Sequence, residues 1–161
     1  MHVSERKLDL LADEDAQISH EPKNAAPLAA RAETLRYLHQ YALALADART
    51  ALALDDKSVA AHIEAAENLD QLDQSKEALA HITRATELNP KDSAAWFHRG
   101  NLEARRANYP AAIESYSRSL EHGESIETLR AREKCERRTG QVDKADADRK
   151  RIRELDWNAP E

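Results

Sequence analysis

The segment EALAHITRATELNP occupies residues 77–90 and superposes without gaps on LALADARTALALDD at 43–56 and on AAIESYSRSLEHGE at 111–124. The same register recurs once more toward the end of the chain, at intervals of 34, 34 and 33 residues, as shown by Ala44, Ala78, Ala112 and Ala145. Self-similarity at a period in this range is the sequence signature of a stacked repeat protein. The sequence therefore predicts four consecutive repeats.

Each repeat is predicted to contain two helices. In the second half of the second repeat, the apolar residues fall at spacings of one, three, three and three, at Ala78, Leu79, Ile82, Ala85 and Leu88. This spacing produces one apolar stripe along a helix and does not fit the alternation of a strand. Asn89-Pro90 ends that helix, because proline disfavours a helical conformation in the residue before it. Asp92 or Ser93 then offers an N-cap for the next helix.

The third repeat carries the most recognisable pattern. Trp96-Phe97-His98-Arg99-Gly100 opens its first helix, Asn108-Tyr109 lies at the turn, and three residues line its second helix, namely Ala112, Tyr116 and Ser119. This pattern resembles the tetratricopeptide repeat (TPR) family, over about residues 25–158. The resemblance implies an all-α fold, a right-handed solenoid of helix-turn-helix units. It also implies a concave surface, lined by the first helix of each repeat, that holds a peptide or helix of another protein.

The register divides the chain into an N-terminal capping helix or degenerate half repeat at 1–24, four repeats, and a short tail at 159–161. The repeats are predicted at 25–58, 59–92, 93–125 and 126–158, and the last is expected to end in a polar C-terminal capping helix. A helix is expected near residues 4–19. Three positions depart from the apolar pattern: Glu14 falls where Ile82 is apolar, and Glu103 and Glu136 replace Leu35 and Leu69.

Composition narrows the class of protein. The chain has 161 residues, 41% hydrophobic and 4% aromatic, with only 3 Gly and 5 Pro, which suits one helical domain and leaves little turn chemistry for an all-β fold. A net charge of −6 argues against nucleic-acid binding. The single cysteine excludes an intrachain disulfide, and no apolar run is long enough for a membrane span or resembles a signal peptide. We therefore expect a soluble, cytoplasmic protein.

When the repeats are aligned with the repeat pattern of the family, nine residues are predicted to line the partner-binding groove: Tyr37, Ile63, Glu67, Gln71, Phe97, Asn101, Arg105, Arg130 and Lys134. Residues 1–92 carry 10 basic and 17 acidic side chains, whereas residues 93–161 carry 14 and 13. The hypothesis is that acidic residues of a bound segment meet Arg105, Arg130 and Lys134, while an apolar anchor meets Phe97 and Ile63. Arginine suits this task because its planar fork donates two parallel hydrogen bonds to a carboxylate. The competing interpretation is that these cations only solvate the end of the stack.

No pattern in the sequence indicates catalysis, a metal or a cofactor. The seven histidines never lie three or four residues apart, so no helix presents a paired metal-ligand face. Three isolated glycines form no phosphate-binding motif. Cys135 is expected to be a buried thiol, and His62 and Trp96 are expected to be packing residues. An enzyme would need a cluster of Glu, His and Cys135 formed only in three dimensions.

The leading prediction is a noncatalytic protein–protein interaction module, acting as an adaptor, scaffold or co-chaperone. Clamping of a chaperone's C-terminal carboxylate, as in some members of the family, is disfavoured because the matching places hold Ala29, Glu33 and Glu64. Two alternatives remain open. One is a cytoplasmic chaperone for secreted proteins, and the other is a self-assembling structural adaptor that forms a homodimer.

Overall fold

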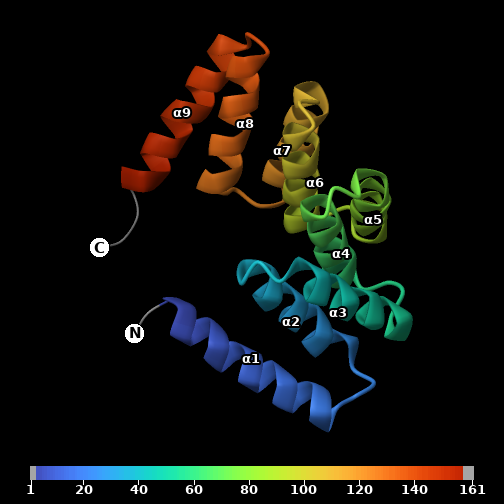
Figure 1. Cartoon of the computed structure of the whole chain (residues 1–161). Helices are drawn as coiled ribbons and strands as arrows, with labels where there is room; N and C mark the ends of the chain where they lie inside the picture. Colours follow the sequence, from blue (N-terminus) through green and yellow to red (C-terminus); the bar gives the residue numbers. More distant parts are fainter. Residues whose placement is uncertain (1–2, 158–161) are drawn as a thin grey trace. The chain divides into compact units, whose positions relative to one another are not determined.

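The computed structural model of the chain describes residues 3–157, which form nine helices and no strand (Figure 1). The predicted all-helical fold class is confirmed. The chain divides into two compact units, an N-terminal unit of Met1–Leu88 and a C-terminal unit of Asn89–Glu161. The N-terminal unit holds α1 (Val3–His20), α2 (Ala25–Tyr37), α3 (Tyr41–Leu54), α4 (Val59–Gln71) and α5 (Ser75–Leu88). The C-terminal unit holds α6 (Ser93–Arg105), α7 (Tyr109–His122), α8 (Ile126–Arg138) and α9 (Val142–Trp157).

The same tight turn joins the two helices of each hairpin. One residue of each turn has a positive φ, at His39 (60°), Asp73 (59°), Ala107 (58°) and Gly140 (76°). The next residue donates its backbone N–H to a carbonyl five positions earlier, from Gln40 to Leu35, Gln74 to Leu69, Asn108 to Glu103 and Gln141 to Glu136, at 2.8–3.0 Å. This hydrogen bond is typical of a helix C-cap in which the residue after the helix adopts the left-handed conformation. The sequence period is therefore visible in the backbone as a repeated turn.

A side-chain cap starts the first helix of each hairpin. The caps are Asn24, Ser58, Asp92 and Ser125, and each side-chain oxygen accepts a bond from a backbone amide of the first turn. Such a bond satisfies one of the amides that a helix N-terminus leaves without an internal partner. Of the two candidates that precede α6, Asp92 is the cap, and it accepts from Ala95 N at 2.9 Å.

Alanine dominates the core of the N-terminal unit. Fully buried alanines lie on α2, α3 and α4, at Ala32, Ala44, Ala48, Ala51, Ala61 and Ala65. All nine residues from Ala61 to Leu69 on α4 are buried. Helices can approach closely where no large side chain intervenes. This explains why the repeat needs alanine at these places.

The N-terminal helix predicted near residues 4–19 is present as α1, Val3–His20. Its Ile18 packs against the buried cluster that contains Leu28 and Ala29. Glu14, which departs from the apolar pattern, is nevertheless buried, and Thr34 Oγ1 donates to its Oε1 at 2.8 Å. Burial raises the pKa of Glu14, although the bond from Thr34 opposes this shift. A polar contact thus takes the place of the expected apolar one.

The C-terminal unit has a core with larger side chains. Ala112, Tyr116 and Cys135 form a buried cluster, and the prediction of a buried thiol is correct. A Cβ on Gly100 would lie 2.5 Å from the Tyr116 ring, so this position on α6 has to be glycine for the ring to fit. Glu103 and Glu136, which replace leucine, are also buried. Asn108 Nδ2 donates to Glu103 at 2.9 Å.

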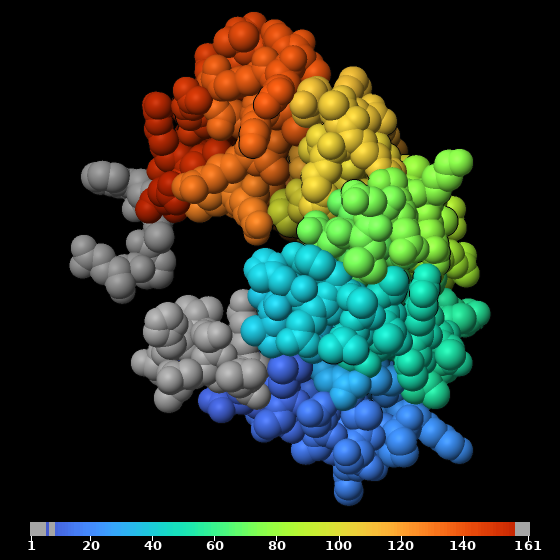
Figure 2. All heavy atoms as spheres, viewed as in Figure 1, coloured from blue at the N-terminus to red at the C-terminus, as the bar shows by residue number. Residues whose placement is uncertain are grey.

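The last helix, α9, contacts the rest of the unit through both apolar and charged side chains. Its buried apolar residues are Ala145 and Ile152. Asp148 is also buried, and it accepts two bonds from Arg132 of α8 at 2.7 and 2.8 Å. In Figure 2 the atoms of α8 and α9, orange to red, lie directly against one another. The predicted polar C-terminal cap is therefore present.

Candidate binding pocket

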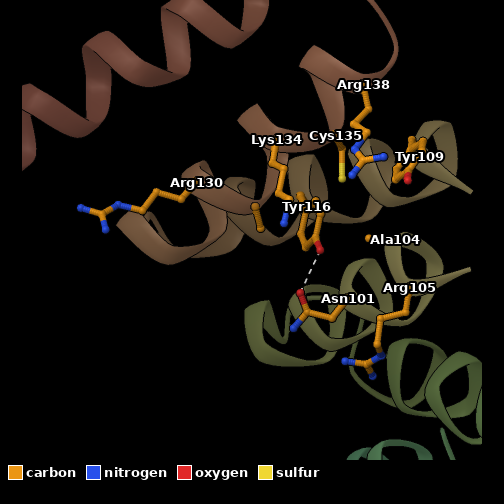
Figure 3. A pocket seen from close by; sticks show the side chains of 10 residues that line it. Asn101, Ala104, Arg105, Tyr109, Tyr116, Arg130, Lys134, Cys135 and Arg138 are labelled. Atoms are coloured by element: carbon orange, nitrogen blue, oxygen red, sulfur yellow. Dashed lines mark hydrogen bonds between the residues drawn. The ribbon is translucent and has the colours of Figure 1, made fainter. Parts of the chain in front are cut away.

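One face of α6 and one face of α8 converge on a pocket within the C-terminal unit. Asn101 and Arg105 lie one turn apart on α6, and Arg130, Lys134 and Arg138 lie at successive turns on α8. The pocket has a volume of about 530 Å³ and opens between α6, α7 and α8 (Figure 3). Its lining consists of Asn101, Ala104, Arg105, Tyr109, Tyr116, Arg130, Ala131, Lys134, Cys135 and Arg138.

Tyr116 forms part of the floor and orients Asn101. Its ring is 2% exposed, and its hydroxyl donates to Asn101 Oδ1 at 2.8 Å, the bond drawn in Figure 3. This bond occupies the carbonyl oxygen of the amide. The amide nitrogen of Asn101 is then the group that can donate to a bound acceptor.

The rim of the pocket is cationic. Figure 3 shows Lys134 pointing toward Tyr116, whereas Arg130 extends away from the other side chains. Arg130 Nη2 lies 3.4 Å from Asp156 Oδ2, and both side chains are more than half exposed, so this ion pair contributes little. Among the described side chains that line the pocket, none is acidic. Arginine and lysine side chains can donate charge-assisted hydrogen bonds to carboxylates.

Tyr109 and Arg138 close one side of the pocket. The Arg138 guanidinium carbon lies 5.6 Å from the centre of the Tyr109 ring. At this distance the cation is attracted to the electron-rich face of the ring. Arg138 is thus held against α7, although its side chain is exposed.

Cys135 lines the pocket without being an activated nucleophile. Burial raises the pKa of its thiol, and the nearby Lys134 opposes that shift only in part. A reactive cysteine needs a lowered pKa, because the thiolate is the nucleophile. The thiol therefore serves as an apolar part of the floor.

Four of the nine residues that the sequence placed on the groove line this pocket: Asn101, Arg105, Arg130 and Lys134. Phe97 does not line it. The Phe97 ring is half-buried and lies 6.0 Å from the Tyr116 ring, against the buried cluster.

The other four predicted residues lie in the N-terminal unit. Ile63 and Glu67 are 7% and 6% exposed, so they present almost no surface to a partner. Tyr37 and Gln71 are exposed, at the ends of α2 and α4. The Arg36 guanidinium lies over the Tyr37 ring, 4.5 Å from its centre.

Sequence reasoning did not assign Ala104, Tyr109 or Ala131 to the site. A usable signal was available, because Ala104 follows Asn101 by three residues and Ala131 lies three residues before Lys134. Residues at this spacing share a helix face. However, an alanine in the sequence does not by itself indicate a pocket. A pocket forms beside an alanine only where the neighbouring side chains are too short or too far away to fill the space next to it.

The equivalent place in the N-terminal unit is filled. Arg36 lies two repeats before Ala104, and Glu64 lies two repeats before Ala131. Arg36 Nε donates to Glu64 Oε2 at 2.9 Å, and the two side chains are 14% and 7% exposed. A long ion pair therefore joins α2 to α4 where two alanines stand between α6 and α8.

No family model matches the chain, and no curated protein matches it significantly. Several solved structures do match the chain. TTC0263, a thermophilic TPR protein in Thermus thermophilus, superposes with a TM-score of 0.80 and 19% identity, over 89% of this chain and 80% of that one. YrrB, a TPR protein with an unusual peptide-binding site, superposes with a TM-score of 0.70 and 21% identity, over 89% and 74%.

The chain has the tetratricopeptide-repeat fold.

The predicted resemblance to TPR proteins is thus confirmed at the level of the fold. MamA, residues 41 to the end, from Desulfovibrio magneticus RS-1 superposes on this TPR fold with a TM-score of 0.77 and 18% identity. That superposition covers 96% of this chain and 88% of the other. The likeness thus extends beyond the four hairpins to most of the chain.

Two further observations bear on the class of site. Within residues 3–157, no three His, Cys, Asp or Glu side chains are grouped so that they could hold a metal ion. Of the helices described, none has the length and apolar character needed to cross a membrane.

Proposed function

We propose that this TPR protein is a noncatalytic interaction module that binds an acidic segment of another protein at the pocket between α6 and α8. The observation that carries the proposal is the donor-rich rim of that pocket. Arg105, Arg130 and Lys134 stand around it, and Asn101 adds an amide donor held in place by Tyr116. Charge-assisted bonds to carboxylates are about twice as strong as neutral hydrogen bonds. The proposal places the protein in the cytoplasm, in keeping with its single cysteine.

The fold supports this proposal. TPR hairpins expose the face of their first helices, and the pocket lies on that face, on α6 and α8. YrrB is described as having a peptide-binding site, and it superposes on most of this chain. Extended and helical segments are both compatible with a cleft between two helices.

Selection of random displayed peptides on the purified full chain tests the proposal. We expect the wild-type protein to enrich acidic peptides and the variant Arg130→Glu with Lys134→Glu to lose that enrichment. Lys144→Glu with Lys150→Glu is the matched control, since it changes the charge equally at exposed positions of α9 outside the pocket. Equal acidic enrichment by the wild type and the Arg130/Lys134 variant, with unchanged salt dependence, would contradict the proposal.

A second candidate function, self-association, is favoured by apolar surface on the N-terminal unit. Leu10 and Leu43 are 50% and 59% exposed. Leu43 also lines a pocket of about 310 Å³ with Leu11 and Leu35. Exposed apolar patches often mark interfaces. Sedimentation at several concentrations separates the two candidates: a monomer that is unaffected by Leu43→Glu rules out self-association through this surface.

A further inference from the structure

The pocket between α6 and α8 has two parts of different chemistry. Its rim carries the cations described above. Its floor is apolar, formed by Ala104, Ala131 and Cys135 with the rings of Tyr109 and Tyr116. A site meant only for carboxylates needs donors and gains nothing from such a floor. An apolar floor removes from water the non-polar part of whatever enters.

The floor is open because two side chains are short. In the N-terminal unit, the Arg36–Glu64 ion pair occupies the equivalent place between α2 and α4. In the C-terminal unit, those repeat positions are Ala104 and Ala131, and the space is a pocket of about 530 Å³. The backbone that holds both pairs is the same repeated hairpin. The identity of these two residues therefore sets the depth of the pocket.

Phe97, which the sequence suggested as the contact for an apolar anchor, does not line this floor. Its ring packs against the Tyr116 cluster and lies outside the lining of the pocket. An apolar group of a ligand therefore has its contact further along α6, at Ala104.

We propose that the pocket takes one apolar side chain of the bound segment between Ala104 and Ala131, with flanking carboxylates on Arg105, Arg130 and Lys134. This inference rests on the proposed function and adds to it the residue class that the partner presents. The partner motif is thus a single apolar residue within an acidic stretch. The apolar side chain supplies burial, and the carboxylates supply orientation and selectivity.

The probes are synthetic labelled peptides SDEEXEEDS, in which X is Leu, Phe, Met or Ser, measured by fluorescence anisotropy with the full chain. We expect at least one of the apolar peptides to bind about tenfold or more tightly than the Ser peptide, the factor that follows from taking such a side chain out of water. All four peptides carry the same charge, so their differences report on the floor and not on the rim.

Two variants that fill the pocket provide the decisive comparison. Ala104→Arg with Ala131→Glu installs the ion pair that the N-terminal unit already uses and leaves the net charge unchanged. Ala131→Leu fills the same space by a different route, in case the pair impairs folding. Both variants should lose the preference for the apolar peptide, whereas Ala147→Leu, on the exposed face of α9, should keep it.

The outcomes separate this inference from the proposed function. Equal affinity of all four peptides, together with loss of binding in the Arg130→Glu, Lys134→Glu variant, would leave the acidic site intact and overturn the apolar subsite. An apolar preference that survives both filling variants would also overturn it. Absence of binding by every peptide would overturn both proposals.

Discussion

The N-terminal and C-terminal units place opposite chemistry on the same repeat positions. Between α2 and α4 these positions hold Arg36 and Glu64, which form a mostly buried ion pair. Between α6 and α8 the same positions hold Ala104 and Ala131, which line an open pocket. The backbone turn that sets the spacing is repeated in both units. A repeat scaffold can therefore be closed in one unit and open in another by exchanging two side chains.

The residues next to these positions also differ in chemistry between the two units. In the N-terminal unit they are acidic, aromatic or apolar, at Glu33, Tyr37, Ile63 and Glu67. In the C-terminal unit the equivalent residues are polar or basic, at Asn101, Arg105, Arg130 and Lys134. The charge at these positions is thus a property of the individual repeat and not of the fold.

The largest effect is expected from breaking the ion pair of the closed unit. Arg36→Ala removes the cation paired with Glu64, a carboxylate only 7% exposed, and should lower the free energy of unfolding by about 3–5 kcal/mol. Arg36→Ala with Glu64→Ala imitates the open unit and should recover a large part of that loss, because no buried carboxylate is left without its cation. Urea unfolding measures both. A double variant no more stable than the single one would show that the two units are not interchangeable at this place.

The next effect concerns how each unit fills its core. Gly100→Ala brings a Cβ to 2.5 Å from the Tyr116 ring and should cost about 1–3 kcal/mol of unfolding free energy through overpacking. In an unobstructed helix the same change would stabilise by about 1 kcal/mol. The N-terminal unit carries Ala66 and Ile82 at these two positions, so Gly100→Ala with Tyr116→Ile should be less destabilising than the sum of the two single substitutions. Thermal unfolding in which Gly100→Ala is stabilising would refute the close packing.

A smaller effect is expected at the turn of the third hairpin. Ala107 adopts a φ of 58°, where an L-residue with a Cβ is strained by about 1–2 kcal/mol, while the fourth hairpin uses Gly140 at the equivalent place. Ala107→Gly should raise the free energy of unfolding by about 1 kcal/mol, since glycine adopts this conformation readily. Ala94→Gly, in the exposed part of α6, is the control and should be destabilising. Urea unfolding that ranks both substitutions alike would argue against strain at Ala107.

The smallest effect is a pH dependence of the hairpin formed by α4 and α5. His62 Nδ1 on α4 lies 3.0 Å from His81 Nδ1 on α5, whereas the C-terminal unit has Trp96 and Ser115 at these positions. Burial lowers the pKa of His81 from its ordinary value of 6.5, and His62 and Arg49 lower it further, against the attraction of Glu77. A lowered folded pKa means stability that is present above about pH 6.5 and is lost as the pH falls below it.

Hydrogen exchange measured between pH 7 and pH 5 checks this sign. Exchange of α4 and α5, corrected for the intrinsic pH dependence, should accelerate on acidification, while exchange of α6 and α7 should not. His81→Ser, which imitates Ser115, should abolish the difference between the two hairpins. Equal acceleration in the variant would place the titrating group elsewhere.

Much of the fold could be predicted because its determinants are local and periodic. The apolar stripe at Ala78, Ile82 and Ala85 predicts a helix, and all three side chains are buried. The N-terminal helix and the polar final helix follow from extending the register to both ends of the chain. Glu14 could be placed on a helix from its position, but its bond to Thr34 could not, because that bond joins residues 20 positions apart.

The site was predictable in part for the same reason. Helical spacing puts Asn101 with Arg105, and Arg130 with Lys134, on one face of their own helix. The resemblance to the TPR family placed both faces on the groove, and all four residues line the pocket. Spacing does not reveal whether a side chain on that face is open or covered, as Ile63 and Phe97 show. Exposure depends on the size of the neighbours contributed by the next helix.

The amino-acid sequence by itself determined the repeat period, the helices and the positions of the turns. These depend on backbone propensity and on residues a few places apart along the chain. Only the tertiary structure decided that the space between α2 and α4 is filled and that the space between α6 and α8 is a pocket. That outcome depends on pairs of residues far apart in sequence, Arg36 with Glu64 and Ala104 with Ala131. The combined volume of each pair decides whether the space is filled, and nothing in the sequence shows which residues form a pair.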